Sequence, residues 1–431
     1  MYLYICMLYL CVLVISAFGP QGRGYESSLL YFNMLNDYWT EAFGENDGRA
    51  SNCTTPAHPI NFTVTDLWNG SGPAVGLNNS KSCSAAAPEG CVYEDDLFVS
   101  RVLATIQASN ASLPFFFFWA PHSVHQPYAS EAPRAYVDKF AFIDVPARRL
   151  YAAQVNYIDD QVGKVVAALK AKGLWDDMLF VMSSDNGGAL YYSGNLSAPP
   201  ALANIEGGNN WPLRGGKMSN TEGGVRVPAL VNGGLLPPAV RGTTLDGFVA
   251  VEDWYTTFCR LAGVNPWDAR AAAAGLPPVD GVDVWPMLSG ASRVTNRTTH
   301  FLGFASGVKT TVQGVIRVTD GWKLLLNSVA PAFWQGPSYP NASSERDVRP
   351  PPLECGDPLE GTGSGCLFNI LRDPHEVVNA AASNPSIVSE LRALVSEAQL
   401  GVFSPDRGPA DSVRFCEQAV TNGGFVGPFL P

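Results

Sequence analysis

The chain has 431 residues, 46% of them hydrophobic and 16% charged, which is enough to bury a large core in one large domain and a smaller one. Its formal net charge of -11 and its lack of any basic run argue against nucleic acid as a partner, because binding to a phosphate backbone needs clustered lysine and arginine. An acidic protein can still hold a local basic pocket, so a small anionic substrate is compatible with this charge.

Residues Met1 to Phe18 are almost wholly apolar, and the first charged residue is Arg23. Three interpretations fit this start: a secretory signal peptide, an uncleaved anchor that would hold the protein at a membrane, or a wrongly assigned chain start. Eight Asn-x-Ser/Thr sequons favour a secreted or lumenal glycoprotein, lysosome-like or extracellular. They lie at Asn52, Asn61, Asn69, Asn78, Asn110, Asn195, Asn296 and Asn341.

Seven cysteines follow the apolar start. In an oxidising compartment Cys83 with Cys91, and Cys355 with Cys366, are plausible local disulfides. The odd count leaves one thiol over, and Cys259, which lies in an apolar helical pattern, is expected to be a buried free thiol.

Residues from about 46 to 90 are rich in Asn, Ser, Gly and Pro and read as an exposed insertion or long loop. A helix is expected to begin near Tyr93. The acid cluster Glu94-Asp95-Asp96 fits a charged helix start better than a metal site, because acids stabilise the first turn of a helix.

The apolar run Pro114 to Ala120 is too short to span a membrane and is typical of a buried parallel strand. His125 follows this run. A histidine there is either a loop cap or, with an ordinary pKa of roughly 6.5, a natural proton donor.

The clearest helix runs from Ala152 to Lys172 and is ended by Gly173. Asp159-Asp160 falls mid-helix and reads as a solvated edge, not a metal pair. The strand Leu179 to Met182 completes a helix–strand step, which favours a parallel sheet.

Ser183-Ser184-Asp185-Asn186-Gly187-Gly188 follows that strand. The side-chain oxygens of Asp185 and Asn186 suit a hard cation such as Ca²⁺, and the two glycines let the backbone fold closely around an ion. The alternative is an ordinary surface turn, because Asp-Asn-Gly is also strong turn chemistry.

A further strand is expected at Val227 to Val231 and a helix from Phe248. From about His300 the pattern changes to antiparallel strands, with a hairpin at Thr319-Asp320-Gly321, and a helix follows at Pro385 to Glu397.

Three motifs now stand in order within about fifty residues. They are Ser184-Asp185-Asn186-Gly187-Gly188, the run Gly207-Gly208-Asn209-Asn210-Trp211-Pro212-Leu213-Arg214-Gly215-Gly216-Lys217, and Glu222-Gly223-Gly224-Val225-Arg226-Val227-Pro228. Together they resemble type I sulfatases, closest to the arylsulfatase B branch. The resemblance implies hydrolysis of sulfate esters with Ca²⁺ and a formylglycine made from cysteine, acting on a sulfate-ester small molecule or a sulfated glycan.

Residue by residue, the resemblance implies that Asp185 and Asn186 are metal ligands and that Lys217 binds the sulfate. His125 stands in a Ser-Val-His-Gln-Pro run that matches the family's Ser-Val-His-Glu-Pro, whose histidine contacts the ester and protonates the leaving oxygen. Arg214 is either a second anion contact or, as we favour, a structural partner of Glu222. The family's Cys-x-Pro-x-Arg nucleophile sequence and its Asp-Asp metal pair have no counterpart in this sequence.

The expected fold is an alkaline-phosphatase-like α/β/α sandwich, incomplete at its amino-terminal side, with a smaller antiparallel carboxyl-terminal subdomain. The expected division is an apolar leader at 1–21, a partial catalytic domain at 22–299 and the subdomain at 300–431. Two functions follow: a Ca²⁺-dependent sulfatase, or an inactive relative or fragment that at most binds sulfate or glycan.

Overall fold

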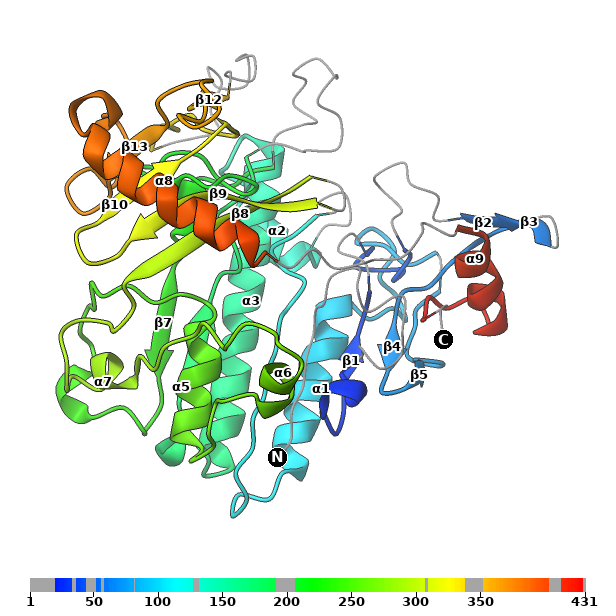
Figure 1. Ribbon diagram of the computed structural model, residues 1–431. Helices are drawn as coiled ribbons and strands as arrows, with labels where there is room; N and C mark the ends of the chain where they lie inside the picture. The colour runs from blue at the N-terminus through cyan, green and yellow to red at the C-terminus, as the bar shows by residue number, and fades with distance from the viewer. Residues whose placement is uncertain are drawn as a thin grey trace. The chain divides into compact units, whose positions relative to one another are not determined.

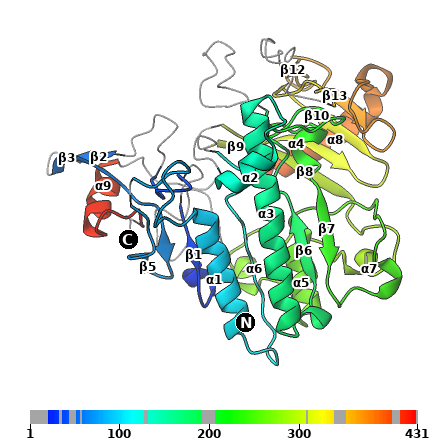
Figure 2. The ribbon, with the colours of Figure 1, turned by 180° about the vertical axis from the view of Figure 1, so that it is seen from behind.

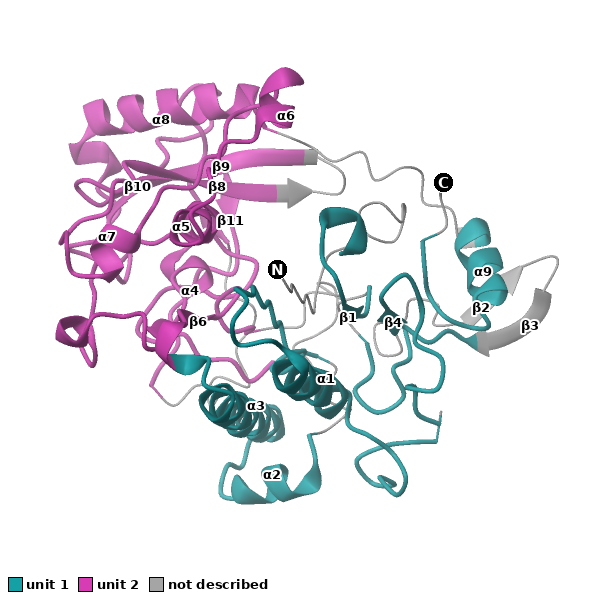
Figure 3. Ribbon diagram, turned by 90° about the horizontal axis from the view of Figure 1, so that it is seen from below, with its two compact units in different colours: residues 1–175, 193–197, 405–431 teal, residues 176–192, 198–404 magenta. Residues whose placement is uncertain are grey.

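The computed structural model describes residues 20–32, 36–43, 52–55, 58–80, 82–126, 132–190, 206–306, 309–337, 352–402 and 412–428. The expected leader therefore lies outside the described residues. By their internal contacts the residues form two compact units (Figure 3): unit 1 holds 1–175, 193–197 and 405–431, and unit 2 holds 176–192 and 198–404. Within the described ranges, no helix is both long and apolar enough to cross a bilayer.

Unit 1 combines helices with short antiparallel strands (Figure 1). Its helices are η3 (Gln21–Arg23), α1 (Glu94–Ala108), α2 (Arg134–Lys139), α3 (Pro146–Ala171) and α9 (Ser412–Thr421). Its strands are β1 (Leu29–Leu30), β2 (Asn52–Thr55), β3 (His58–Thr63), β4 (Trp68–Asn69) and β5 (Gly72–Pro73).

The long helix predicted in this unit is confirmed as α3. It begins earlier than expected, at Pro146, because a proline in the first helical turn loses no hydrogen bond and has a suitable φ. It ends before Gly173, whose φ of 75° suits glycine. Asp159 and Asp160 are exposed on its surface, as predicted.

Two expectations for unit 1 are wrong. The run Pro114 to Ala120 forms no strand and pairs with no strand among the described residues, and Phe118 is 43% exposed. The segment around 46–90 is not all loop, because it contains strands β2 to β5 and contributes Val64 and Leu67 to the core. The Asn- and Gly-rich composition predicted a loop, but the apolar side chains of this segment still pack into the core when strands form around them.

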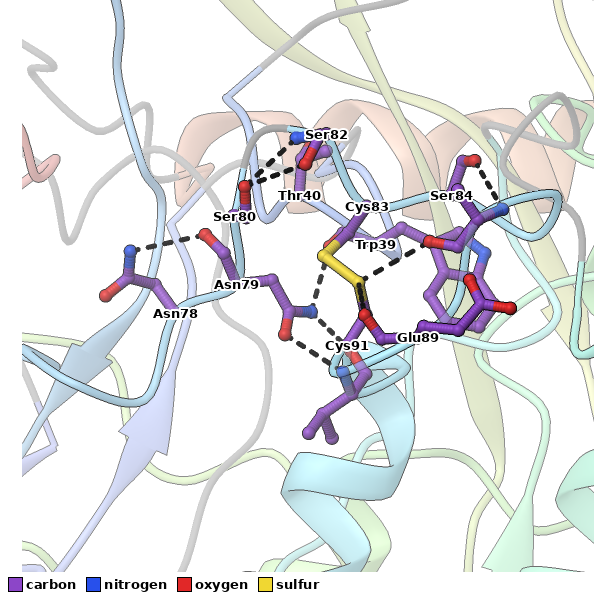
Figure 4. The surroundings of a disulfide bond; sticks show 12 residues. Trp39, Thr40, Asn78, Asn79, Ser80, Ser82, Cys83, Ser84, Glu89 and Cys91 are labelled. Carbon is purple, nitrogen blue, oxygen red and sulfur yellow. Dashed lines mark hydrogen bonds between the residues drawn. A yellow bond between two sulfur atoms is a disulfide. The ribbon is translucent and has the colours of Figure 1, made fainter.

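The disulfide between Cys83 and Cys91 forms as predicted and closes a loop of unit 1 (Figure 4). Beside it, the Asn79 side-chain amide donates to the backbone oxygen of Trp39 and its oxygen accepts from the backbone N–H of Val92. The predicted Cys355–Cys366 disulfide is present in unit 2, and Cys259 is a half-buried free thiol. A disulfide therefore closes each loop, and hydrogen bonds of Asn79 support the first.

Unit 2 contains the remaining elements, and η4 (Trp175–Asp177) joins the two units in sequence. Its helices are α4 (Glu222–Val225), η6 (Pro238–Val240), α5 (Asp253–Leu261), α6 (Ala269–Ala273), α7 (Trp285–Leu288), η8 (Ala381–Ser383) and α8 (Pro385–Leu400). Its strands are β6 (Phe180–Ser183), β7 (Ala229–Asn232), β8 (Thr299–Ser306), β9 (Lys309–Arg317), β10 (Trp322–Leu325), β11 (Ser328–Val329), β12 (Leu353–Glu354) and β13 (Cys366–Asn369).

The predicted carboxyl-terminal antiparallel sheet is confirmed, with strand order β13-β10-β9-β8. Asp320-Gly321 turns the chain between β9 and β10, as expected. Helix α8 lies across this sheet in Figures 1 and 2, and its Val388 and Leu391 pack with Val315 and Leu324 of the strands. This sheet and helix lie inside unit 2 and are not a separate compact unit.

The strand that precedes the Asp-Asn-Gly-Gly loop is confirmed as β6, but its pairing differs from the prediction. It pairs with β7 in antiparallel register, Phe180 opposite Asn232 and Ser183 opposite Ala229 (Figure 2). A parallel neighbour needs a long crossover, usually helical, and the described part of the connection contains only the four-residue helix α4. The described part of residues 184–228 therefore connects the two strands without a helical crossover, and β7 runs opposite to β6.

Candidate active site

The loop with Asp185 and Asn186 begins where β6 ends. The Ser184 N–H donates to Pro228 O (3.1 Å), which extends the pairing of β6 with β7 by one step. Asp185 is exposed and its Oδ1 accepts from the Asn186 N–H at 2.8 Å, while Asn186 Nδ2 donates to Gly187 O at 2.9 Å. Both side chains are thus oriented by the loop's own backbone.

Close backbone packing explains the glycines of this loop. Gly187 donates to Gly224 O of α4 at 2.9 Å, and a Cβ on Gly187 would lie 1.7 Å from Gly223 O. Gly223 in turn donates to Arg214 O at 2.6 Å. Side chains at these positions would force the three segments apart, so the sequence uses glycine where backbones touch.

The Asn210 side chain forms hydrogen bonds that join the loop at Gly188 to the segment at Gly215. Its Oδ1 accepts from the Gly188 N–H at 2.8 Å, and its Nδ2 donates to Gly188 O at 2.9 Å and to Gly215 O at 3.0 Å. The Lys217 N–H donates to the same Gly188 carbonyl at 3.2 Å. One amide thereby fixes Lys217 relative to the loop that carries Asp185 and Asn186.

Lys217 stands near two carboxylates. Burial lowers the pKa of Lys217 below its ordinary value, and the negative charges of Asp185 and Glu206 offset part of that effect. Glu206 is only 3% exposed, and burial raises its pKa to about 7 despite the attraction of Lys217. A half-desolvated ammonium between acids is suited to hold an anion once a cation balances Asp185.

The donor chemistry of this loop fits a Ca²⁺ ion. A carboxylate and an amide oxygen on adjacent residues are the ligand types that this ion prefers, and the amide nitrogen of Asn186 is already engaged by Gly187 O. In the part of the chain that is described, no cluster of three or more His, Cys, Asp or Glu side chains is arranged for a metal. If a Ca²⁺ ion binds at this loop, Asp185 and Asn186 would supply two of the six to eight oxygens that it takes.

A buried cluster of charged side chains anchors helix α4 to strand β10. Lys323 of β10 is 0% exposed and pairs with Glu222 Oε1 at 2.8 Å and Glu376 Oε1 at 2.9 Å. Burial alone would lower the pKa of Lys323, but the two carboxylates raise it above its ordinary value. Glu376 also accepts from the Glu222 backbone N–H, so the cluster holds the start of α4 against the sheet.

Arg214 is structural, as predicted, although its partner is not Glu222. Its Nε donates to Ala332 O at 2.6 Å, its Nη1 donates to Glu376 O, and its guanidinium lies 4.3 Å from the centre of the Trp334 ring. These contacts engage one face of the guanidinium and two of its nitrogens, Nε and Nη1.

In unit 1, the loop of His125 is held by the first turn of α1. Asp95 accepts hydrogen bonds from the His122 and Ser123 N–H groups and from the Ser123 hydroxyl, all at 2.9 Å or less. Glu94 pairs with His122 at 2.7 Å. The acid cluster does start a helix, as predicted, but Glu94 and Asp95 are fully buried and position the histidine loop.

The structure thus brings Asp185, Asn186 and Lys217 together in unit 2 and places His125 in unit 1. Sequence reasoning missed Glu206, Asn210 and His122. Asn210 stood inside a recognised motif without a role, and its neighbour Asn209 offered the same chemistry. Nothing in the local sequence connects His122 to Glu94, because their contact joins residues 28 positions apart.

Comparisons with known proteins agree with one another. A family model described as Sulfatase matches residues 21–264, more than half of the chain. Mouse arylsulfatase J is 29% identical over 78% of this chain, and pig N-acetylgalactosamine-6-sulfatase is 36% identical over 47% of it. The chain spans about half the length of arylsulfatase J (53%) and about a third of the pig protein (33%).

Solved structures show the same fold. The PsFucS1 sulfatase from Pseudoalteromonas sp. has a TM-score of 0.61 at 19% identity and covers 93% of this chain and 70% of its own. Ps i-CgsB in complex with k-i-k-neocarrahexaose has a TM-score of 0.62 at 20% identity, over 95% of this chain and 73% of its own. The family and fold predictions are confirmed, but the arylsulfatase B branch is not, since other sulfatases also match.

Replacing Glu206 by Gln tests the buried acid beside Lys217. The pKa of Glu206 is about 7 in the fold against 4.5 in its ordinary state, so its burial costs nothing below pH 4.5. The cost grows as the pH rises from about 4.5 to about 7 and then stays constant, reaching about 3 kcal/mol. Urea unfolding at pH 4 and pH 8 should show Glu206→Gln as a gain in stability at pH 8 only. The exposed Glu397→Gln is the control, and equal effects of both variants would contradict the assignment.

Replacing Lys323 by Met tests the anchor of α4. Two carboxylates would stay buried without their cation, so the free energy of unfolding should fall by about 3–5 kcal/mol. Adding Glu222→Gln and Glu376→Gln should restore much of it, because no uncompensated charge is then left. The control is Arg134→Met in an exposed pair with Asp138, where a change of at most about 1 kcal/mol is expected. Denaturant unfolding measures all of these, and a Lys323→Met loss no larger than the control's would refute the anchor.

Proposed function

Because the chain belongs to the sulfatase family, we propose that it serves in the hydrolysis of sulfate esters with a bound Ca²⁺. The observation that supports this most strongly is the fixed relation between the Asp185–Asn186 loop and Lys217, through the shared contacts of Gly188. An oxygen-donor pair and a half-buried ammonium held together are what a site needs to bind a tetrahedral dianion beside a hard cation.

In this proposal, Asp185 and Asn186 hold the ion through their side-chain oxygens, and the bound ion supplies positive charge to the sulfate oxygens. Lys217 binds the sulfate as a point charge. Its pKa is lowered mainly by burial, so loss of water from the ammonium strengthens its attraction for the anion. Glu206 balances the ammonium when no anion is bound only above about pH 7, where its carboxyl is ionised, because burial raises its pKa to about 7.

We assign the role of proton donor to His125 because its Ser-Val-His-Gln-Pro run matches the family motif. His125 is held by its loop: its N–H donates to the Tyr38 hydroxyl at 3.3 Å, and the Tyr38 hydroxyl donates to His125 O at 2.9 Å. A positioned imidazole can give its proton to the leaving alcohol oxygen. Gln126, in place of an acid, adds no charge beside this ring.

The formylglycine of the family does not fit these 431 residues, because none of their cysteines stands in a Cys-x-Pro-x-Arg sequence. The nearest stretch, Cys53-Thr54-Thr55-Pro56, lacks the spacing and the arginine. The chemistry proposed for His125, Lys217 and the Asp185–Asn186 loop therefore includes no step through a formylglycine. The second candidate follows from this observation: the 431 residues alone bind sulfate or a sulfated glycan and do not hydrolyse it.

We propose a sulfated glycan as the substrate class, in a secreted or lumenal glycoprotein. The support comes from the names of relatives, one an N-acetylgalactosamine-6-sulfatase and one a structure in complex with neocarrahexaose, and from the sequons of this chain. An aryl sulfate ester is the alternative substrate class, and the name of the relative arylsulfatase J supports it.

Calorimetric titration tests the binding site directly. The chain should bind Ca²⁺, and inorganic sulfate should bind more tightly when Ca²⁺ is present. Asp185→Asn should weaken Ca²⁺ binding by at least about tenfold, since it removes a charged ligand. Lys217→Gln should abolish the sulfate effect and leave Ca²⁺ binding within a few fold. The exposed Asp159→Asn and Lys170→Gln are matched controls, and equal binding by all four variants would refute the site.

Peptide mapping separates the two candidate functions. The protein purified from its source is digested and searched by mass spectrometry for a formylglycine. Finding one supports the hydrolase. Finding none, in protein that binds Ca²⁺ and sulfate, supports the binding protein.

A further inference from the structure

A second histidine, His122, lies near His125, and both of its ring nitrogens have partners. His122 is only 2% exposed; its Nδ1 is 2.7 Å from Glu94 Oε2, and its Nε2 is 3.1 Å from the backbone oxygen of Gln126. Its ring stacks on Tyr38 with centroids 4.0 Å apart. The far oxygen of Glu94 accepts from Asn36 Nδ2. The ring therefore has a single well-defined orientation.

The partners of His122 determine where its protons lie. A carbonyl oxygen only accepts, so Nε2 of His122 must carry a hydrogen to bond Gln126 O. At Nδ1, either the ring donates to an ionised Glu94 or a protonated Glu94 donates to the ring. Burial and the nearby Asp95 raise the pKa of Glu94 well above its ordinary value, which fits a proton shared across this contact. In both cases the Nε2–H donor is permanent and the pair has no net charge.

The Gln126 carbonyl also faces His125, whose Nδ1 lies 3.1 Å from the same oxygen. By the same rule this Nδ1 must carry a hydrogen. The two protonation states of His125 then differ at Nε2 alone. One backbone oxygen, fixed by His122, thus determines which nitrogen of His125 can exchange a proton.

We propose that His122, held by Glu94, is a positioning residue that fixes the Gln126 carbonyl and thereby selects the Nδ1–H tautomer of His125, so that Nε2 is its proton-transfer atom. The inference rests on the proposed role of His125 as proton donor. It assigns a purpose to a buried Glu–His pair that the metal and sulfate site in unit 2 does not use. It also explains why two acids of the α1 start are buried against this loop.

The test is nitrogen NMR on chain labelled with ¹⁵N-histidine. The sequence has five histidines, so single His→Gln variants assign each ring. At a pH where His125 is neutral, its ring should show Nδ1–H as the dominant tautomer. His122→Phe keeps a ring against Tyr38 but removes the Nε2 donor, and should shift most of the His125 population to Nε2–H. Glu94→Gln should leave the Nδ1–H form dominant, since an amide can donate to His122 Nδ1.

The control is His300→Gln, which removes a histidine bound to Glu252 in unit 2 and should not affect His125. A dominant Nε2–H form of His125 in the unaltered chain would overturn the proposal without any variant. An unchanged tautomer in a folded His122→Phe would also overturn it. If His122→Phe does not fold, His122→Gln replaces it, and retention of Nδ1–H is then expected because its amide can still donate to Gln126 O. No substrate is used, so a lack of hydrolysis would leave this result intact and count only against the proposed function.

Discussion

The arrangement of the candidate site depends on three stretches of backbone that touch where side chains would prevent contact. Gly187, Gly188, Gly215 and Gly223 lie in these stretches, and the amide of Asn210 satisfies the carbonyls and the N–H that the contact buries. An unsatisfied buried carbonyl costs on the order of 1–3 kcal/mol, so this amide supports the whole crossing. The relative positions of Asp185, Asn186 and Lys217 depend on it.

Buried acidic side chains fix the positions of segments next to the two candidate loops, the Asp185–Asn186 loop and the His125 loop. In unit 2, Glu222 and Glu376 share Lys323 and hold α4 to the sheet; in unit 1, Glu94 and Asp95 hold the histidine loop to α1. Such groups are unfavourable to bury and are kept only when paired. Paired buried charges beside both candidate loops are consistent with a defined loop geometry, which apolar packing alone would specify less well.

Much of this architecture could be predicted from the sequence. Helices α1, α3 and α8, the hairpin of β9 and β10, strand β6 and both local disulfides follow from periodicity, turn residues and cysteine spacing. The conformation of the run Pro114 to Ala120 and the pairing of β6 could not be predicted, because an apolar run of residues does not indicate which segment it packs against or pairs with. The contacts of Asn210, Lys323 and His122 join residues distant in sequence, and only the folded chain shows them. The roles of Asp185, Asn186, Lys217 and His125 rest on family motifs and stay predictions.

The measurement that tests the central claim most directly is sulfate release from sulfated glycans by the protein purified from its source, with and without a Ca²⁺ chelator. We expect release that depends on Ca²⁺ and that is lost with Lys217→Gln in the recombinant form of the same protein. A formylglycine-bearing protein that binds Ca²⁺ but releases no sulfate from glycan or aryl esters would contradict the proposed hydrolysis.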